Sequence, residues 1–439
     1  MKVLDFIAIG LGPFNLSLAC LSEKLDDVNG LVLEQKSRFD WHPGMMIEGV
    51  TLQTPFMSDL VTMADPTNPY SFLNYSKKHG RLYSFYIRES FFLLRQEYNQ
   101  YCQWATKQLT NVQFDTQVQS VHYMESEDCY HLVCIDRRNN LEVDYYAKRL
   151  VLGTGPSPYI PQNLSEVKSA LVHSGQYLYR KPLLQASNSI SIVGSGQSAA
   201  EIFYDLLQDA PERGYQLNWF TRANRLFPLE YTKLTLEMTS PEYVDYFYDL
   251  PAEKRDALIS QQKNLYKGIN SSLINDIYDL LYQQNIAGHQ CATIATNSEL
   301  LAVSATAEQQ FQLTINQHEL GQNYQLQSEQ VVMATGYAYQ VPEFLSPIKD
   351  RINWDGNGRY DVDRGYSIDN QQRIFVQNAE LHTHGFVTPD LGMACYRNSH
   401  IINQIAGRVV YQIESRIAFQ QFGVPEQSGA EINEQGMAC

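Results

Sequence analysis

The chain has 439 residues, of which 44% are hydrophobic and 18% charged, and its net charge is −15. This length favours two or three domains, and the composition is typical of a folded enzyme rather than a disordered chain. The negative charge argues against nucleic acid as a partner, because the phosphate backbone would repel the protein. The sequence has no apolar run of about 18 residues, so we expect no membrane span.

The seven cysteines are scattered and form no CxxC pair. An odd, dispersed set is typical of free thiols in a reducing compartment, and it provides no zinc site. The N-terminus leads into an apolar stretch without a basic region before it, so we expect no signal peptide. We therefore predict a cytoplasmic protein without a catalytic metal.

The first element in chain order is an apolar run, residues 3–9, which predicts a buried parallel strand. Gly10 and Gly12 follow, and a helical pattern begins at Pro13, a residue that suits a first helical turn. Such a turn can hold a pyrophosphate at the helix N-terminus. The next strand ends in Glu34, 22 residues beyond Gly12, where an acid can bind both ribose hydroxyls of an adenosine.

The usual third glycine of this fingerprint is absent, and Asn15 stands near its place. An ordinary strand–turn–helix is therefore the alternative. Residues 37–90 are irregular and aromatic-rich, as functional loop regions often are. An amphipathic pattern predicts a helix over residues 89–110, and alternation over 112–152 predicts antiparallel strands. The last of these strands ends in a Gly-Thr-Gly motif.

The opening pattern returns at residues 189–201 as a strand, a Gly194-x-Gly196 turn and a helix. The next strand ends in Arg222 rather than in an acid. An arginine there can pair with the 2′-phosphate of NADPH, although it could also be an ordinary surface residue. One unit with an acid and one with an arginine suit FAD and NADPH respectively. Two unrelated glycine turns are the alternative to a flavin-dependent NADPH oxidoreductase.

The remaining chain completes a predicted α/β fold with two Rossmann-like dinucleotide-binding domains and a small, mostly helical substrate region. A helix is expected from about 391 to 413, and a mobile polar tail follows. The predicted parts are residues 1–165 and 334–415 for the FAD-binding domain, 166–225 and 286–333 for the NADPH-binding domain, 226–285 for the substrate region and 416–439 for the tail.

A set of motifs along residues 3–410 resembles the siderophore-associated N-hydroxylating monooxygenases, flavoenzymes that hydroxylate the terminal amine of ornithine, lysine or a diamine. The motifs are Gly10-x-Gly12-Pro13-x-Asn15, Trp41-His42-Pro43-Gly44-Met45, Leu52-Gln53, Asp59-Leu60, Asp65-Pro66-Thr67, Gly194-x-Gly196-Gln197-Ser198-Ala199, Ala334-Thr335-Gly336-Tyr337 and Thr383-His384-Gly385. The resemblance is strongest to the diamine branch, which acts on putrescine or cadaverine.

The resemblance implies that NADPH reduces FAD, that O2 then forms a C4a-hydroperoxyflavin, and that the substrate amine attacks its distal oxygen to give a hydroxylamine. Only a neutral amine has the required lone pair, and a free alkylamine has a pKa of about 10.4. The site must therefore desolvate the amine or accept its proton. The resemblance also implies a homo-oligomer, either a dimer or a tetramer.

Site residues follow from the same resemblance. The residues that fall on the family's FAD-contacting motifs are Gly10, Gly12, Pro13, Asn15, Glu34, Trp41, His42 and Gln53. Those that fall on its NADPH motifs are Gly194, Gly196, Gln197, Ser198 and Arg222. Thr335, Gly336 and Leu391 are further predicted cofactor contacts. Gln53 and Asn264 are the predicted catalytic residues, and Asn264 lies near a segment that touches the amine and the nicotinamide. His42 and His384 could instead be buried structural histidines.

The chain departs from the amino-acid enzymes at three substrate positions. Those enzymes contact the amino-acid head group of the substrate with a lysine, which pairs with the α-carboxylate, an asparagine and a serine. Here Ser58, Leu236 and Gly392 stand at the matching places. Burying the substrate carboxylate without its cation would weaken the free energy of binding by roughly 3–5 kcal/mol. The departure therefore predicts a diamine, with Asp390 as the preferred partner of the distal ammonium and Glu237 as a second candidate.

Three alternatives remain at this point. An L-lysine N6- or L-ornithine N5-monooxygenase could have moved carboxylate recognition to another cation, such as Lys233 or Lys267. A general flavin monooxygenase acting on ketones or sulfides shares the two dinucleotide units but does not explain the Gln53–Asp65 segment. A non-catalytic flavoprotein would bind FAD without turning over NADPH with any amine.

Overall fold

The computed structural model describes residues 2–306 and 310–424. Within these ranges, no helix combines the length and the apolarity that a bilayer crossing needs. Of the predicted tail, residues 416–424 lie inside the described part of the chain and 425–439 lie outside it.

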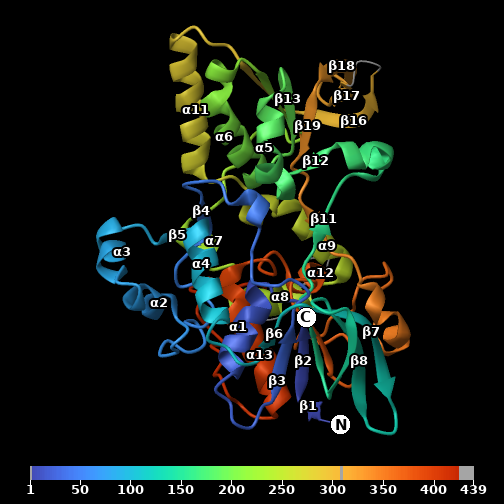
Figure 1. Ribbon diagram of the computed structural model, residues 1–439. Helices are drawn as coiled ribbons and strands as arrows, with labels where there is room; N and C mark the ends of the chain where they lie inside the picture. Colours follow the sequence, from blue (N-terminus) through green and yellow to red (C-terminus); the bar gives the residue numbers. More distant parts are fainter. Residues whose placement is uncertain (1, 307–309, 425–439) are drawn as a thin grey trace, which may run out of the picture.

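A five-stranded parallel sheet is the centre of the first unit, in the lower half of Figure 1. Its strands pair in the order β21–β10–β2–β3–β6, with Ile9 beside both Leu152 and Leu33. Every residue of β2 is buried, as expected for an apolar strand covered on both faces. The strands are β2 (Phe6–Ile9), β3 (Gly30–Leu33), β6 (Val112–Gln113), β10 (Leu150–Leu152) and β21 (Ile374–Val376).

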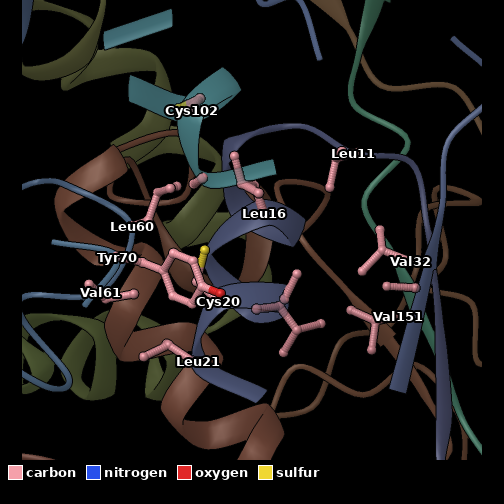
Figure 2. Packing of buried hydrophobic residues seen from close by; sticks show 14 of the residues in the cluster. Leu11, Leu16, Cys20, Leu21, Val32, Leu60, Val61, Tyr70, Cys102 and Val151 are labelled. Carbon is pink, nitrogen blue, oxygen red and sulfur yellow. The ribbon is translucent and has the colours of Figure 1, made fainter. Parts of the chain in front are cut away.

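Helices α1 (Pro13–Ser22), α4 (Arg95–Thr106) and α13 (Ala394–Ala406) cover one face of this sheet. Figure 2 shows Leu16 and Cys20 of α1 in the same apolar cluster as Val32 and Val151 of the strands. The other face packs against η4 (Glu343–Arg351) and a second sheet. That sheet has the order β1–β9–β8–β7 and consists of β1 (Val3–Leu4), β7 (Thr116–Met124), β8 (Cys129–Asp136) and β9 (Leu141–Ala147).

The second unit, in the upper half of Figure 1, repeats the parallel sheet with the order β12–β19–β13–β14–β15. It is flanked by α5 (Tyr177–Gln185), α6 (Gln197–Arg213) and α11 (Ser271–Ile286) and by a three-stranded antiparallel sheet. The strands are β12 (Val172–His173), β13 (Ser189–Val193), β14 (Gln216–Phe220), β15 (Ala292–Ala295), β16 (Ser298–Ala305), β17 (Phe311–Gln317), β18 (Gln322–Ser328) and β19 (Gln330–Met333). The predicted fold class is confirmed.

Two connections join the units, and these connections lie next to each other. The chain leaves the first unit through β11 (Ser157–Pro158) and returns through β20 (Tyr337–Ala338), and these two segments pair antiparallel. β11 begins just after the Gly-Thr-Gly motif and β20 begins with the last residue of the Ala-Thr-Gly-Tyr motif, so both motifs mark the junction. Short helices fill the space beside it: α7 (Lys233–Leu236), α8 (Pro241–Asp249), α9 (Ala252–Gln261), α10 (Lys263–Tyr266), α12 (Leu381–His384), η2 (Gln162–Ala170) and η3 (Ser174–Gln176).

Three predicted elements differ in the structure. The helix expected over 89–110 begins only at Arg95, because β5 (Phe92–Leu94) pairs with β4 (Thr51–Pro55) instead. The expected irregular region of residues 37–90 contains η1 (Pro43–Met45), α2 (Phe72–Lys78) and α3 (Leu82–Arg88). The helix expected from 391 to 413 is split into η5 (Leu391–Met393) and α13, which ends at Gly407 with a left-handed cap.

The start of the predicted tail is anchored. Glu242 accepts the backbone N–H groups of Ile417 and Ala418, and Glu237 accepts those of Phe419 and Gln420 at 3.0 and 2.9 Å. Residues 417–420 are therefore held against α7 and α8 rather than free. Glu237 is occupied by this segment, so it is no longer a candidate partner for a substrate ammonium.

Candidate active site

A cavity of about 830 Å³ lies where the two units and the helical region meet. Its lining comes mainly from residues 9–54, 116–118, 153–156, 229–266 and 377–391, and Arg95, Gly175, Tyr337 and Phe344 complete it. Most of the predicted FAD contacts line it, together with Leu236, Asp390 and Leu391. This size is typical of small-molecule sites.

The first glycine turn is built as a phosphate-binding turn. Gly10 has φ +88°, and a Cβ there would lie 2.6 Å from the carbonyl oxygen of Gly153. A Cβ at Gly12, by contrast, would have nothing within 4 Å, so the space beside the N-terminus of α1 is open. These observations fit a pyrophosphate in the position expected for FAD.

Asn15 explains why the third glycine is dispensable. Its Nδ2 donates to the carbonyl of Gly10 at 2.7 Å, and its Oδ1 accepts from Gln377 Nε2 at 2.6 Å. The side chain also fills the space that a Cβ on Gly153 would need. Asn15 thus connects the turn to the ends of β10 and β21, and it does so with its own side chain fully buried.

Glu34 directly follows β3, as predicted, and is 7% exposed. One carboxylate oxygen accepts the backbone N–H of Leu11 at 2.7 Å and the other that of Lys36 at 2.9 Å. A carboxylate can accept about four hydrogen bonds, so capacity remains toward the cavity that Glu34 lines. The arrangement fits a ribose diol.

His42 and His384 differ in their surroundings. His42 lines the cavity with a left-handed backbone (φ 49°), packs between Trp41 and Tyr337, and has its pKa lowered to about 4 by burial and by the nearby Arg95. His384 is fully buried, stacks on Tyr366 and lies 2.9 Å from the Thr383 hydroxyl. His42 therefore lines the cavity, whereas His384 is enclosed by protein and does not belong to the described lining.

Gln53 lies where the units meet. Its Nε2 is within hydrogen-bond distance of the Gly268 carbonyl at 3.2 Å, Asn270 Oδ1 at 3.1 Å and Gln197 Oε1 at 3.4 Å. These acceptors fix the amide nitrogen toward the second unit, and Gln53 still lines the cavity. Asn270 was not singled out from the sequence, because no local pattern marks its contact with a residue 217 positions away.

The substrate side of the cavity carries acids and apolar groups. In the described part of the chain, the charged residues that line it over 229–266 and 377–391 are Glu230 and Asp390, both acidic. Asp390 Oδ1 accepts the N–H of Gly392 at 2.8 Å. Burial raises the pKa of Asp390, and the Gly392 hydrogen bond and the Arg397 charge partly oppose this. The apolar lining consists of Leu229, Leu236, Leu265, Tyr266 and Phe386.

Two of the predicted substrate positions, Ser58 and Gly392, lie beside Asp390 but are not part of the described cavity lining, whereas Leu236 lines the cavity itself. A Cβ on Gly392 would be 3.2 Å from Ser58 Oγ, so these two positions are adjacent although they are far apart in sequence. Ser58 is 8% exposed. Neither Lys233 nor Lys267 belongs to the cavity lining within the described ranges, so a relocated carboxylate contact has no support there.

Asn264 reaches the cavity indirectly. Its Nδ2 donates to Glu230 Oε1 at 2.5 Å, and its carbonyl accepts the N–H of Glu230 at 3.3 Å. The neighbouring Leu265 and Tyr266 line the cavity, whereas Asn264 does not appear in its described lining. A direct contact between Asn264 and a substrate stays a prediction.

The predicted NADPH residues lie outside this cavity, at the edge of the second sheet. α6 begins at Gln197 with Gly196 as its N-cap, and a Cβ on Gly194 would lie 2.3 Å from the carbonyl oxygen of Ala334. The Arg222 side chain is 70% exposed just beyond β14. Arg222 and Lys263 also lie near enough to Lys267 to lower its pKa, in addition to the effect of burial. This basic group fits a phosphate.

Two parallel-sheet units, each with a glycine turn at a helix N-terminus and joined around a shared cavity, define a two-domain flavoprotein oxidoreductase. The comparison with protein families is more specific. The model of the L-lysine 6-monooxygenase/L-ornithine 5-monooxygenase family matches residues 2–339, and the chain belongs to this family. It is therefore a flavin-dependent N-monooxygenase that uses FAD and NADPH with O2, as predicted.

Individual relatives are similar over nearly the whole chain. The putrescine N-hydroxylase of Shewanella oneidensis is 53% identical over 96% of this chain and 84% of its own length. The putrescine N-hydroxylase of Acinetobacter baumannii is 47% identical over 96% of this chain and 94% of its own. The FAD-bound structure of DfoA, the cadaverine monooxygenase of the desferrioxamine pathway of Erwinia amylovora, has a TM-score of 0.96 and 57% identity, covering 97% of this chain and 100% of that one.

Proposed function

We propose that the protein N-hydroxylates one terminal amine of an aliphatic diamine, putrescine or cadaverine, for the biosynthesis of a hydroxamate siderophore. The acidic substrate wall is the observation that carries this proposal. Within the described residues the only cations that line the cavity are Lys36 and Arg95, both outside that wall. An α-carboxylate would meet Glu230 and Asp390 there, whereas a second ammonium would be attracted.

Asp390 is the proposed partner of the distal ammonium. It faces the cavity among apolar groups, and a buried cation needs an anionic or carbonyl partner. Ser58, Leu236 and Gly392 complete the proposed substrate site by offering no cation where an amino acid would need one. The absence of a lysine at position 58 therefore contributes to the selectivity as much as Asp390 does.

The chain's own residues prepare the reacting amine. Bound FAD, once reduced by NADPH, would activate O2, which provides the oxygen atom. The apolar wall of Leu236, Leu265, Tyr266 and Phe386 disfavours an ammonium, so it lowers the pKa of the reacting amine and frees its lone pair. Gln53 is the proposed catalytic residue that lies over the flavin, and Asn264 acts through Glu230.

The cofactor assignments follow the same pattern. We propose that Gly10, Gly12, Pro13, Asn15, Glu34, Trp41, His42 and Leu391 hold FAD and that Gly194, Gly196, Gln197, Ser198, Arg222, Thr335 and Gly336 hold NADPH. The predicted domain boundaries are proposed with one change. The arrangement of strands into two parallel sheets supports them, whereas the packing of α11 in the core of the second unit favours placing residues 271–286 in the NADPH-binding domain.

A homo-oligomer and a cytoplasmic location are also proposed. The exposed apolar side chains of α3 support the first. The second is supported by six free cysteines in the described part of the chain, since a reducing compartment keeps thiols free.

A substrate panel tests the proposed function. Purified protein with FAD and NADPH is supplied with putrescine, cadaverine, ornithine or lysine, and hydroxylamine product is measured. We expect product from the diamines and little from the amino acids. The relatives named for putrescine and cadaverine are about equally similar to this chain, so the panel also decides the preferred chain length. Faster turnover of ornithine or lysine at equal concentration would contradict the proposal.

A further inference from the structure

A buried ion pair crosses from the first unit to the second. Arg95 begins α4 and Glu201 lies on α6, and the pair is bidentate, with Nη1–Oε2 at 3.0 Å and Nη2–Oε1 at 2.7 Å. The Glu201 side chain is 1% exposed and that of Arg95 14%. Arg95 Nη1 also donates to the carbonyl of Met45 at 2.7 Å. The pair therefore ties the Trp-His-Pro-Gly-Met segment to the helix that follows the second glycine turn.

The hydrogen bonds beyond Glu201 have a fixed direction. A carboxylate only accepts, and Gln197 Nε2 donates to Glu201 Oε1 at 3.0 Å. Gln197 Oε1 must then point the other way, where it accepts the N–H of Asn270 at 2.8 Å and faces Gln53 Nε2 at 3.4 Å. The charge on Glu201 thus orients Gln197, and Gln197 holds the 268–270 backbone against Gln53.

We propose that Glu201 is a positioning residue for the N-hydroxylation. Resting on the proposed function, the inference is that the Glu201 carboxylate sets the amide direction of Gln197 and thereby holds Gln53 and residues 268–270 at the cavity. In the coupled reaction, the amine, O2, NADPH and a proton give the hydroxylamine, NADP+ and water. In the uncoupled reaction, O2, NADPH and a proton give NADP+ and hydrogen peroxide. A displaced Gln53 favours the second outcome.

The substitution Glu201→Gln keeps the shape of the side chain and reverses one hydrogen bond. Its amide would offer one oxygen to the donors of Arg95 and Gln197, and its NH2 would face one of them. Turning the Gln197 amide removes that clash but presents its own NH2 to the N–H of Asn270 and the Nε2 of Gln53. If the new oxygen takes the place of Oε1, Gln197 keeps its acceptor and the conflict falls on Arg95 Nη1. In the opposite arrangement the conflict falls on Gln197 and reaches the cavity.

Product yield is the first measurement. For Glu201→Gln we expect roughly a fivefold fall in hydroxylamine formed per NADPH consumed, about the effect of one lost hydrogen bond, with peroxide in its place. Asp205→Asn is the matched control, because Asp205 lies one turn further on α6 and pairs with Lys181 of α5 within the same unit at 2.8 Å. Its coupling should equal that of the wild type.

Hydrogen exchange is the second measurement and needs no turnover. The amides of residues 268–270 should exchange faster in Glu201→Gln than in the wild type or in Asp205→Asn. Glu201→Asp, which keeps an acceptor-only group, should retain more coupling than Glu201→Gln even if it is less stable. Glu201→Leu, which removes both acceptor oxygens, is the test variant if Glu201→Gln leaves Gln197 in place or does not fold.

Unchanged coupling and unchanged exchange in both Glu201→Gln and Glu201→Leu would overturn the inference, as would an equal loss in Asp205→Asn. Failure of the proposed function looks different. In that case the wild type itself would form no hydroxylamine from either diamine, while the exchange experiment would still report on the link from Glu201 to residues 268–270.

Discussion

Single side chains set the chemistry of the cavity through what they lack as well as what they carry. Ser58, behind Gly392, provides no cation, while Asp390 and Glu230 provide the charges of the proposed substrate wall. Asp390 is held by the N–H of Gly392, so its orientation does not depend on a substrate. Glu237, which the sequence suggested as a second ammonium partner beside Asp390, instead accepts the backbone N–H groups of Phe419 and Gln420.

The substitution Asp390→Asn should raise the KM for putrescine roughly tenfold to a hundredfold, because a charged hydrogen bond contributes about 1.5–3 kcal/mol. Burial raises the pKa of Asp390 above its ordinary value of 3.8, so the wild type loses this contact as the pH falls through that raised pKa. The ratio of kcat/KM between wild type and variant should therefore shrink toward low pH. Steady-state kinetics across the pH range measure it.

The control for this experiment is Glu237→Gln, which removes a carboxylate of the neighbouring segment that does not belong to the described cavity lining. Its KM for putrescine should match that of the wild type. An Asp390→Asn enzyme with normal KM at every pH would exclude Asp390 as the ammonium partner.

At the scale of elements, the two glycine turns are built on one plan with one difference. Gly10 packs against the carbonyl of Gly153, and Gly194 packs against that of Ala334, so each turn rests on the end of a neighbouring strand. In the first turn, Asn15 adds a side-chain link to Gln377 of the C-terminal part. The FAD turn therefore depends on chain that is 362 residues away.

The substitution Asn15→Ala should weaken FAD binding and lower stability by about 1–3 kcal/mol, because the Gln377 amide and the Gly10 carbonyl lose a buried partner. Flavin content after gel filtration and the free energy of unfolding in urea measure the two effects. Asn188→Ala is a suitable control, since Asn188 pairs with Glu329 at the exposed end of β13. Full flavin retention in Asn15→Ala would show that the turn does not need this link.

At the scale of the whole molecule, α2 and α3 extend away from the two units, at the left of Figure 1. The side chains of Tyr83, Tyr86 and Ile87 on α3 are 76%, 78% and 74% exposed, and Phe91 beyond it is 64% exposed. Residues 72–91 contain four Lys or Arg and one Glu, whereas the whole chain has a net charge of −15. An apolar, basic arm on an acidic protein is suited to contact a second copy of the same chain.

We expect the wild type to be a dimer or tetramer and the double substitution Tyr86→Glu and Ile87→Glu to lower its mass, because two buried charges disfavour an apolar contact. Light scattering coupled to gel filtration measures the mass. Tyr278→Glu, on the exposed α11 of the second unit, is the control and should leave it unchanged. A monomeric wild type would refute both the predicted oligomer and the role of α3.

The sequence by itself determined the features that depend on residues close together in the chain. A strand, a glycine turn and a helix begin within about 15 residues of one another, so the sequence predicted both dinucleotide-binding units. The acid and the arginine that follow the second strand of each unit lie close enough in the chain to be predicted as well. The same holds for Ser58 and Gly392, whose departures from the amino-acid enzymes are visible within short motifs. Local patterns misplaced the start of α4, because Phe92 and Leu94 fit an amphipathic helix as well as they fit β5.

Only the tertiary structure decided the contacts between distant segments. Gln53 meets Gln197 and Asn270, Glu201 meets Arg95, and Asn15 meets Gln377, at separations of 106 to 362 residues. Such contacts leave no periodicity in the sequence, because each side chain needs only the right place in three dimensions. Glu201 can be buried as a charge because Arg95 pairs with it. The acidic wall of the cavity forms because residues 229–266 lie against residues 377–391.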